Sequence, residues 1–115
     1  MAAATKLLIQ YRATLGAMVT MAAIGRDARL AFLHPVARSI GGPAVRAMAT
    51  VGGNLCNASP AGDTLVPLLA LDASAVLAAG TGDARRTRRV PLAQFFTGPG
   101  RSCRQPDELL VAVEV

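Results

Sequence analysis

Aromatic residues are scarce in this 115-residue chain: they make up 3% of it, with one Tyr and no Trp. A hydrophobic core must therefore be built from Ala, Leu and Val, which bury less area per residue than aromatic rings do. Hydrophobic residues still make up 52% of the chain and charged residues only 17%, which argues against disorder. The length fits one small domain. A core of this kind favours a chain that depends on a partner surface or a bound ligand for part of its stability.

Cysteine and histidine are also scarce. The two cysteines, Cys56 and Cys103, form no CxxC pair and cannot make a zinc or iron–sulfur site by themselves. We expect both to be reduced structural thiols, because a single disulfide is uncommon in an Ala/Leu-rich chain without a clear signal peptide. The single histidine, His34, has no acid or nucleophile beside it, which favours a helix-start or surface role. No metal site and no catalytic residue is predicted.

No apolar run is long enough to cross a membrane. Residues 65–79 are apolar, but Pro67 and Asp72 interrupt them, and a helical span needs about 20 residues. The start of the chain lacks the continuous apolar region of a signal peptide, because Lys6 and Arg12 interrupt it. We therefore expect a cytoplasmic location.

Basic residues outnumber acidic ones, which gives a net charge of +5, and four arginines cluster at Arg85, Arg86, Arg88 and Arg89. A basic cluster can mark nucleic-acid binding. A solvated strand or hairpin is the simpler interpretation, and no aromatic residue that could stack on bases lies beside the cluster. We predict no nucleic-acid partner, and a small basic module for nucleic acid or a protein partner is kept as a minor alternative.

Periodicity and turn residues predict short helices and strands in the first half of the chain. Residues 15–19 are typical of a short buried strand, after which Thr20 can cap a short helix. Apolar residues at helical spacing predict a second helix that starts near His34, with Pro35 in its first turn. The Gly-Gly-Pro sequence at 41–43 ends this helix.

The second half of the chain predicts one buried helix and three strands. Residues 44–63 contain little periodicity and many turn formers. A buried helix follows over 64–72, for which Asp63 is a credible N-cap. The remaining elements are expected to be, in order, a strand over 74–80, a partner strand over 85–91, one helical turn over 91–96 and a strand over 109–115.

The segment 49–63, ATVGGNLCNASPAGD, is unusually rich in polar and turn-forming residues between apolar neighbours. Gly52 and Gly53 have no Cβ, so each can adopt positive φ at little cost. Consecutive backbone N–H groups could then converge into an anion-binding nest that suits a phosphate or pyrophosphate. The chain contains neither GxxxxGK[ST] nor GxGxxG, which excludes an NTPase P-loop and a Rossmann fingerprint.

Three polar side chains flank this glycine pair. Thr50 and Asn54 offer hydrogen bonds on either side of it, and Asp63 offers a carboxylate that could accept hydrogen bonds from sugar or ribityl hydroxyls. A structural alternative stays open at this point: a tight turn between packed elements, in which Asp63 only caps a helix, explains the same residues.

The exact run ATVGGNLCNASPAGD resembles the second FAD-binding motif in the flavin domain of the molybdenum hydroxylases, which include xanthine dehydrogenases and aerobic carbon monoxide dehydrogenases. The similarity extends over residues 14–115, through LGAMVTMAAI, LVPLLALDASAVL, VPLAQFFTGPGRS and PDELLVAVEV. Residues 1–13 are expected to be an N-terminal extension without a counterpart in the family. The resemblance implies an α+β fold, a small antiparallel sheet flanked by helices, which is the second subdomain of a PCMH-type FAD-binding domain.

The resemblance also implies cofactor contacts. The family's Thr/Ser-x-Gly-Gly-Asn/Asp motif falls on residues 50–54 and would contact the FAD phosphates and nearby polar groups. The aspartate of its Ser-Pro-x-x-Asp motif falls on Asp63, and an apolar residue of the strand after PDEL would lie near the flavin ring. Arg46, which precedes the motif, would support its loop. The expected FAD-binding residues are Thr50, Gly52, Gly53, Asn54, Asp63, Leu110 and Val111.

In intact members of the family, electrons pass from iron–sulfur clusters through FAD to NAD or oxygen. The implied partners are an iron–sulfur subunit and a molybdopterin-binding large subunit. The family's preceding subdomain, with its own Gly-rich FAD motif, and its following C-terminal domain are missing from this chain. We therefore expect residues 14–115 to be a partial FAD-binding domain that is not active alone. The alternative is a degenerate fragment without FAD binding or activity.

Overall fold

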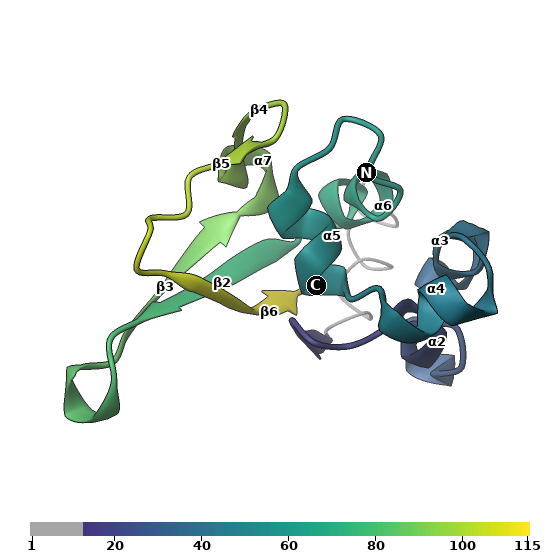
Figure 1. The fold of residues 1–115 in the computed structure, drawn as a ribbon, viewed down its shortest axis with the longest axis horizontal. Helices are drawn as coiled ribbons and strands as arrows, with labels where there is room; N and C mark the ends of the chain where they lie inside the picture. The colour runs from purple at the N-terminus through teal and green to yellow at the C-terminus, as the bar shows by residue number, and fades with distance from the viewer. Residues whose placement is uncertain (1–12) are drawn as a thin grey trace, which may run out of the picture.

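The computed structural model describes residues 13–115 of the chain. The predicted N-terminal extension, residues 1–13, lies outside the described residues except for its last position. Two regions stand beside each other in Figure 1: a helix lobe, residues 21–48, and a sheet lobe, residues 14–16 and 51–115. The candidate site lies in the sheet lobe, close to the segment that connects the two.

Four strands form an antiparallel sheet with the spatial order β1-β6-β2-β3. Alternate residues of β2 point into the core, so that Ala75 and Leu77 are buried, and Val113 of β6 lies opposite Ala75. The predicted α+β fold with a small antiparallel sheet is therefore confirmed. The strands are β1 (Thr14–Gly16), β2 (Ser74–Ala79), β3 (Arg86–Pro91) and β6 (Leu109–Glu114).

The predicted hairpin of two consecutive strands is also present. Strands β2 and β3 pair along their whole length, and the hairpin projects from the sheet in Figure 1. Its turn needs glycine at Gly80, which has φ +78°, because a Cβ there would lie 2.5 Å from the carbonyl oxygen of Ala84. One turn of 3-10 helix, η2 (Gly82–Ala84), closes the tip.

Four short helices make up the helix lobe, and its local signals agree with the sequence. The Thr20 hydroxyl accepts a hydrogen bond from the Ala23 N–H at 3.1 Å, which confirms the predicted cap. Pro35 lies in the first turn of its helix, as predicted. Arg46 donates to the carbonyl of Gly41 at 2.7 Å, so it supports the end of the preceding helix, not the glycine motif. The helices are α2 (Met21–Ile24), η1 (Ala28–Leu33), α3 (His34–Ser39) and α4 (Pro43–Met48).

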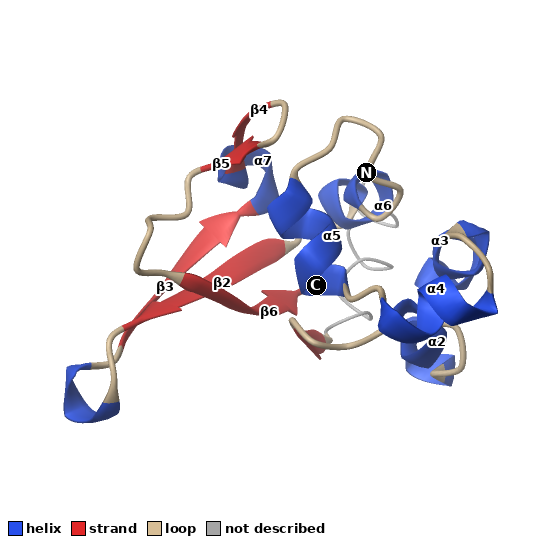
Figure 2. Ribbon diagram, viewed as in Figure 1, coloured by secondary structure: helices blue, strands red, loops and turns tan. Residues whose placement is uncertain are grey.

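Three further helices and a two-stranded ribbon belong to the sheet lobe, where α5 packs beside β6 (Figure 2). Residues 44–63 show little periodicity in the sequence, yet α4 and α5 occupy much of this segment. No helix in residues 13–115 combines the length and the apolar character that crossing a membrane requires. The elements are α5 (Val51–Asn57), α6 (Leu65–Ala70), α7 (Leu92–Phe95), β4 (Phe96–Gly98) and β5 (Arg101–Ser102).

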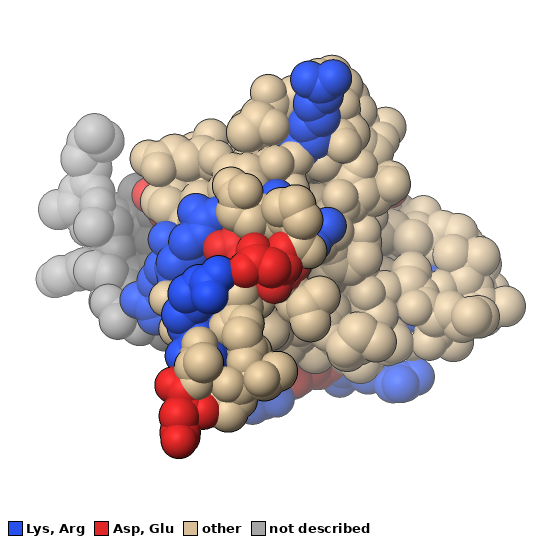
Figure 3. Space-filling view, turned by 60° about the vertical axis from the view of Figure 1, so that its left-hand side comes forward, with Lys and Arg blue, Asp and Glu red and all other residues tan. Residues whose placement is uncertain are grey.

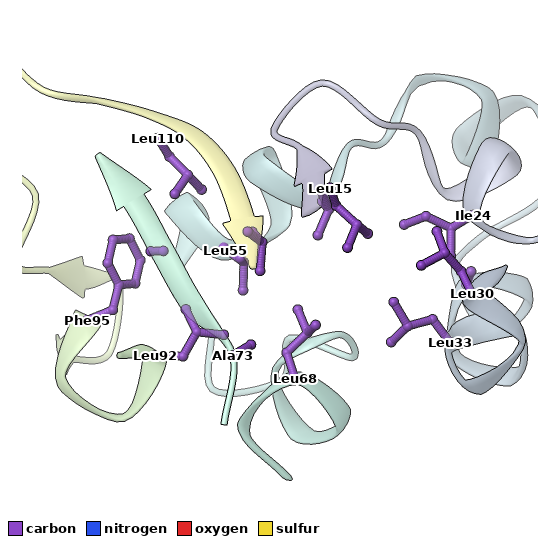
Figure 4. Packing of buried hydrophobic residues seen from close by; sticks show 14 of the residues in the cluster. Leu15, Ile24, Leu30, Leu33, Leu55, Leu68, Ala73, Leu92, Phe95 and Leu110 are labelled. Carbon is purple, nitrogen blue, oxygen red and sulfur yellow. The ribbon is translucent and has the colours of Figure 1, made fainter. Parts of the chain in front are cut away.

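The core is mainly aliphatic, as the composition predicts (Figure 4). Leucines from different elements meet in it, among them Leu55 of α5 and Leu68 of α6, both fully buried. One aromatic side chain, Phe95, is also fully buried and contacts Phe96 edge-on, with 5.0 Å between ring centroids. Helix α5 is therefore anchored through the core, which fixes the position of the glycine motif.

Candidate cofactor groove

The glycine motif forms the first turn of a helix. Gly52 and Gly53 lie inside α5, and neither is among the positive-φ residues of the described chain. The prediction that these glycines adopt positive φ and form an anion-binding nest is therefore wrong. The sequence offered Gly-Gly as a turn signal, and tertiary contacts convert it into a helix.

Those tertiary contacts come from residues 17–19. Residues 17–19 follow β1 and form a turn, in which the Val19 N–H donates to the Gly16 carbonyl at 3.0 Å. The strand predicted over 15–19 therefore ends at Gly16. The Val51 N–H donates to the Val19 carbonyl at 3.0 Å, and the Gly52 N–H donates to the Ala17 carbonyl at 2.9 Å. Two donors that a helix N-terminus usually leaves unpaired are thus used within the protein.

The third donor is satisfied by a side chain. The Thr50 hydroxyl accepts from the Gly53 N–H at 3.0 Å, as an N-cap does. Gly52 is required by close approach, since a Cβ there would lie 2.7 Å from both the Cβ and the carbonyl oxygen of Ala17. Gly53 is exposed, and its missing side chain leaves the surface of α5 open beside Thr50.

An open groove of about 340 Å³ lies between α5 and the start of β6. One wall is the exposed side of α5, and the other comes from the loop before β6 and from its first residues. Residues 17 and 18 complete the lining. The full lining is Ala17, Met18, Thr50, Gly52, Gly53, Cys56, Arg104, Leu109 and Leu110.

Four of the seven predicted FAD-binding residues line this groove: Thr50, Gly52, Gly53 and Leu110. The other three, Asn54, Asp63 and Val111, do not. The Val111 carbonyl accepts from the Ala17 N–H at 2.9 Å, so its backbone helps to hold the segment that lines the groove.

Asn54 and Asp63 lie close to the same turn of α5 without lining the groove. The Asn54 side-chain oxygen accepts a hydrogen bond from the Thr64 hydroxyl, which ties α5 to the residue after Asp63. The prediction that Asp63 caps the following helix is wrong: α6 begins at Leu65, and Thr64 occupies the N-cap position. The Asp63 carboxylate is exposed at the end of the loop between the two helices.

Five lining residues are not among those predicted from the sequence: Ala17, Met18, Cys56, Arg104 and Leu109. Cys56 belongs to the motif segment, and its helical position one turn after Gly52 and Gly53 would have placed it on the same wall. Arg104 stands between the helical turn predicted over 91–96 and the strand predicted over 109–115, and no local signal distinguishes it from the other arginines. Both cysteines are free thiols, as expected.

A buried carboxylate organises the loop that carries Arg104. Glu108 is 7% exposed, and its side chain accepts from Arg88 at 2.6 Å and from the Gln105 N–H at 2.8 Å. These hydrogen bonds lower the pKa of Glu108 to about 2. The carbonyl of Glu108 accepts from the Arg104 guanidinium at 2.6 Å.

The arginine cluster at 85–89 is largely paired within the chain. Arg86 binds Asp107 at 2.5 Å, Arg88 binds Glu108, and Arg89 binds Glu114. Figure 3 shows basic and acidic side chains in contact on the face that carries the hairpin. Internal pairing of this kind favours the interpretation of the cluster as a solvated hairpin over a nucleic-acid surface.

A second open groove, of about 310 Å³, lies in the helix lobe and includes none of the seven predicted FAD-binding residues. Three arginines line it, and two of them already donate to backbone carbonyls: Arg38 to Gly25 at 3.0 Å, and Arg46 to Gly41. Hydrogen bonds of this kind hold the lobe together. The groove beside α5 is therefore the candidate site.

Comparison with known proteins identifies the family of the chain. The family model described as "FAD binding domain in molybdopterin dehydrogenase" matches residues 10–115. The xanthine dehydrogenase FAD-binding subunit of Escherichia coli O157:H7 is 41% identical over 80 residues, which cover 70% of this chain and 26% of that subunit. The glyceraldehyde dehydrogenase medium chain of Sulfolobus acidocaldarius is 37% identical over 87 residues, which cover 76% of this chain and 30% of that one.

The fold has counterparts among solved structures. Quinoline 2-oxidoreductase from Pseudomonas putida 86 superposes with a TM-score of 0.82 at 28% identity, over 91% of this chain and 37% of that one. The chain thus spans about a third or less of the length of the curated relatives named above. The predicted family, fold class and cofactor are confirmed. On this match, the chain belongs to the FAD-binding domain family of the molybdopterin dehydrogenases.

Proposed function

We propose that this chain supplies one wall of the FAD site in the flavin subunit of a molybdenum hydroxylase. The observation that carries the proposal is the groove itself, where the start of α5 and the start of β6 bring Thr50, Gly53 and Leu110 together. Leu110 is far from Thr50 and Gly53 in sequence, and the family motif includes Thr50 and Gly53. A groove of about 340 Å³ can hold part of a dinucleotide, with other segments of the intact subunit enclosing the rest.

The polar end of the groove suits the diphosphate of FAD. Thr50 accepts from the Gly53 N–H through its oxygen, which leaves its hydroxyl hydrogen available for a phosphate oxygen. Gly53 presents no side chain that would block a ligand from approaching α5. The backbone donors of Val51 and Gly52 are already used, so the role of Gly52 is to let α5 pack against Ala17.

The apolar end of the groove suits the flavin ring. Leu109, which is 69% exposed, and the buried Leu110 both line the groove, so they offer apolar contacts to a ring. Bound FAD would supply the electron-transfer chemistry that amino-acid side chains lack. The chain's own residues position the cofactor and shield it.

Asn54 and Asp63 would complete the polar end from outside the groove. The Asn54 amide nitrogen keeps two donors after its oxygen has accepted from Thr64. Because that bond holds the end of the loop against α5, the exposed Asp63 carboxylate could accept from ribityl or ribose hydroxyls. Val111 contributes through its carbonyl, which holds Ala17 in place.

In the intact enzyme, the chain would hold FAD where electrons pass from iron–sulfur clusters to NAD or oxygen. The corresponding partners are an iron–sulfur subunit and a molybdopterin-binding large subunit. The medium-chain and FAD-subunit names of the relatives support an assembly of this kind. The substrate would be set by the large subunit.

A titration tests the proposal. The full chain is mixed with FAD, with and without the co-expressed partner subunits, and binding is followed by flavin absorbance and fluorescence quenching. We expect saturable binding that is tighter in the presence of the partners. No binding under either condition would contradict the proposal and favour a degenerate fragment.

Two variants make the titration specific to the groove. Gly53→Trp fills the open surface of α5 and should abolish binding, while a matched Gly98→Trp control adds the same side chain at a glycine outside the groove. Equal loss in both variants would indicate damage to the fold instead of a blocked site. Circular dichroism of each variant supplies that check.

A further inference from the structure

Arg104 is held firmly at the edge of the groove. Its guanidinium donates to the Glu108 carbonyl at 2.6 Å. The loop that carries it is braced by the Glu108 carboxylate, which binds the Gln105 N–H at 2.8 Å, and by Arg88, which donates to the Cys103 carbonyl at 3.1 Å. The direction in which Arg104 extends is therefore set by the fold.

The charge of Arg104 is not neutralised by an acid. The ion pairs within residues 13–115 involve Arg29, Arg86, Arg88 and Arg89, and none involves Arg104. The hydrogen bond to the Glu108 carbonyl uses one of its five N–H donors. A positive charge with free donors thus lines a groove that is otherwise uncharged.

This charge lies close to the apolar residues that line the groove at the start of β6. The carbonyl that binds Arg104 belongs to Glu108, whose peptide bond leads directly to Leu109. On the opposite wall, partial burial raises the pKa of the Cys56 thiol, and the charge of Arg104 acts in the opposite direction. The guanidinium therefore acts across the groove, from the Leu109 side to the second turn of α5.

We propose that the positive charge of Arg104 raises the reduction potential of FAD bound in the groove. The inference rests on the proposed function, in which the ring occupies the apolar end. Oxidised FAD takes up two electrons and one proton to give the anionic reduced form, whose negative charge lies at N1 and the C2 oxygen. A nearby cation stabilises that anion more than the neutral oxidised ring.

The test is a reduction potential. The full chain, together with the partner subunits where they are needed for binding, is loaded with FAD. It is then reduced by dithionite in the presence of a reference dye, for the wild type and for Arg104→Gln. We expect Arg104→Gln to weaken binding of reduced FAD, relative to oxidised FAD, about tenfold. For a two-electron couple, this change lowers the potential by about 30 mV.

The matched control is Arg101→Gln. Arg101 is an exposed arginine of β5, three residues before Arg104, and it does not line the groove. The Arg101→Gln substitution should leave the reduction potential of bound FAD unchanged. Arg104→Lys keeps the charge and should retain most of the wild-type potential.

The outcomes separate this inference from the proposed function. If FAD binds to the wild type and Arg104→Gln has the same potential, the inference is wrong and the proposed function stands. If Arg104→Gln weakens oxidised and reduced FAD equally, the residue binds the diphosphate, and the inference is also wrong. If the wild type binds no FAD, both fail.

A second measurement covers the case in which Arg104→Gln does not fold. The charge of a groove-edge arginine is screened by salt. The potential of the wild type should therefore fall as KCl is raised from 0.02 to about 0.5 M. A potential that is independent of salt would overturn the inference.

Discussion

Helices α4 and α5 are separated by two residues, yet α4 has no buried side chain and α5 has three buried residues, Val51, Gly52 and Leu55. The N-cap residue of α4 is Gly42, which has no side chain to cap it, whereas the N-cap residue of α5 is Thr50, whose hydroxyl caps it. The first N–H groups of α5 also donate hydrogen bonds to the carbonyls of Ala17 and Val19. The position of α5 is thus fixed by contacts with the rest of the chain, while α4 is held mainly by its own lobe.

The difference shows why the candidate site is in the sheet lobe. A cofactor wall needs a helix whose backbone cannot shift, because a small displacement changes every contact with the ligand. Helix α5 meets that requirement through its burial and its anchored first turn. The exposed apolar side chains of α4, Val45 and Met48, contribute to no such wall.

The largest expected effect comes from truncating a core side chain of α5. Leu55→Ala should reduce the free energy of unfolding by about 3 kcal/mol, because Leu55 is fully buried. Met48→Ala in α4, where the side chain is 82% exposed, should change it by less than about 0.5 kcal/mol. Urea denaturation followed by circular dichroism measures both. Similar losses in the two variants would contradict the contrast between these helices.

The second effect comes from adding a methyl group at a glycine. Gly52→Ala places a Cβ 2.7 Å from the Ala17 backbone and should destabilise the protein by about 2 kcal/mol. Gly42→Ala, next to α4, has no atom within 4 Å of the new Cβ and should be nearly neutral. Thermal unfolding of both variants makes the comparison. A neutral Gly52→Ala would mean that α5 does not need its close approach to Ala17.

Signals confined to one turn could be read from the sequence. The cap at Thr20, the proline in the first turn of α3 and the β2–β3 hairpin were predicted because each depends on neighbouring residues only. Helix α5 was missed because two glycines disfavour a helix locally, and distant carbonyls at residues 17–19 stabilise it. Arg104 was missed for the same reason, since its place in the groove depends on a loop braced by Arg88.

The third effect separates the two threonine caps. Thr50→Ala and Thr20→Ala should each reduce stability by about 1 kcal/mol, because each removes one capping hydrogen bond. Only Thr50→Ala should also weaken FAD binding, because only Thr50 lines the groove. Isothermal titration with FAD distinguishes the variants. Equal affinities would remove Thr50 from the proposed diphosphate contacts.

The smallest difference concerns two carboxylates and appears only in acid. Hydrogen bonds from the Arg29 side chain and backbone lower the pKa of Asp27 to about 2. Hydrogen bonds from the Arg88 side chain and the Gln105 N–H lower the pKa of Glu108 to about 2. A carboxyl whose pKa is lower in the folded than in the unfolded protein stabilises the fold at pH values above its unfolded-state pKa. Both contributions should therefore be present at neutral pH and be lost as the pH falls from about 4.5 to about 2.

Salt should distinguish the two carboxylates. The Asp27 pair is open to solvent, because the Arg29 side chain is 86% exposed, whereas the Glu108 side chain is 9% exposed. In about 1 M NaCl, salt screens the exposed Asp27 pair but not the buried Glu108 pair. The acid-induced loss of stability should therefore persist in the wild type and in Asp27→Asn, and it should be reduced in Glu108→Gln. Unfolding curves recorded from pH 6 to pH 2 test this. Identical profiles for both variants would show that burial does not separate them.

The pairing of β1 with β6 has a kinetic consequence for the groove. Thr14 lies opposite Glu114, so this pairing joins the two ends of the described chain and is the contact of longest sequence separation in the sheet. Such contacts close the largest loops and tend to form late in folding. Because residues 17–19 follow β1 directly and anchor α5, the groove should mature only after the ends have met. Amide exchange at Val51 and Gly52 would then report detachment of β1 while the β2–β3 hairpin stays protected.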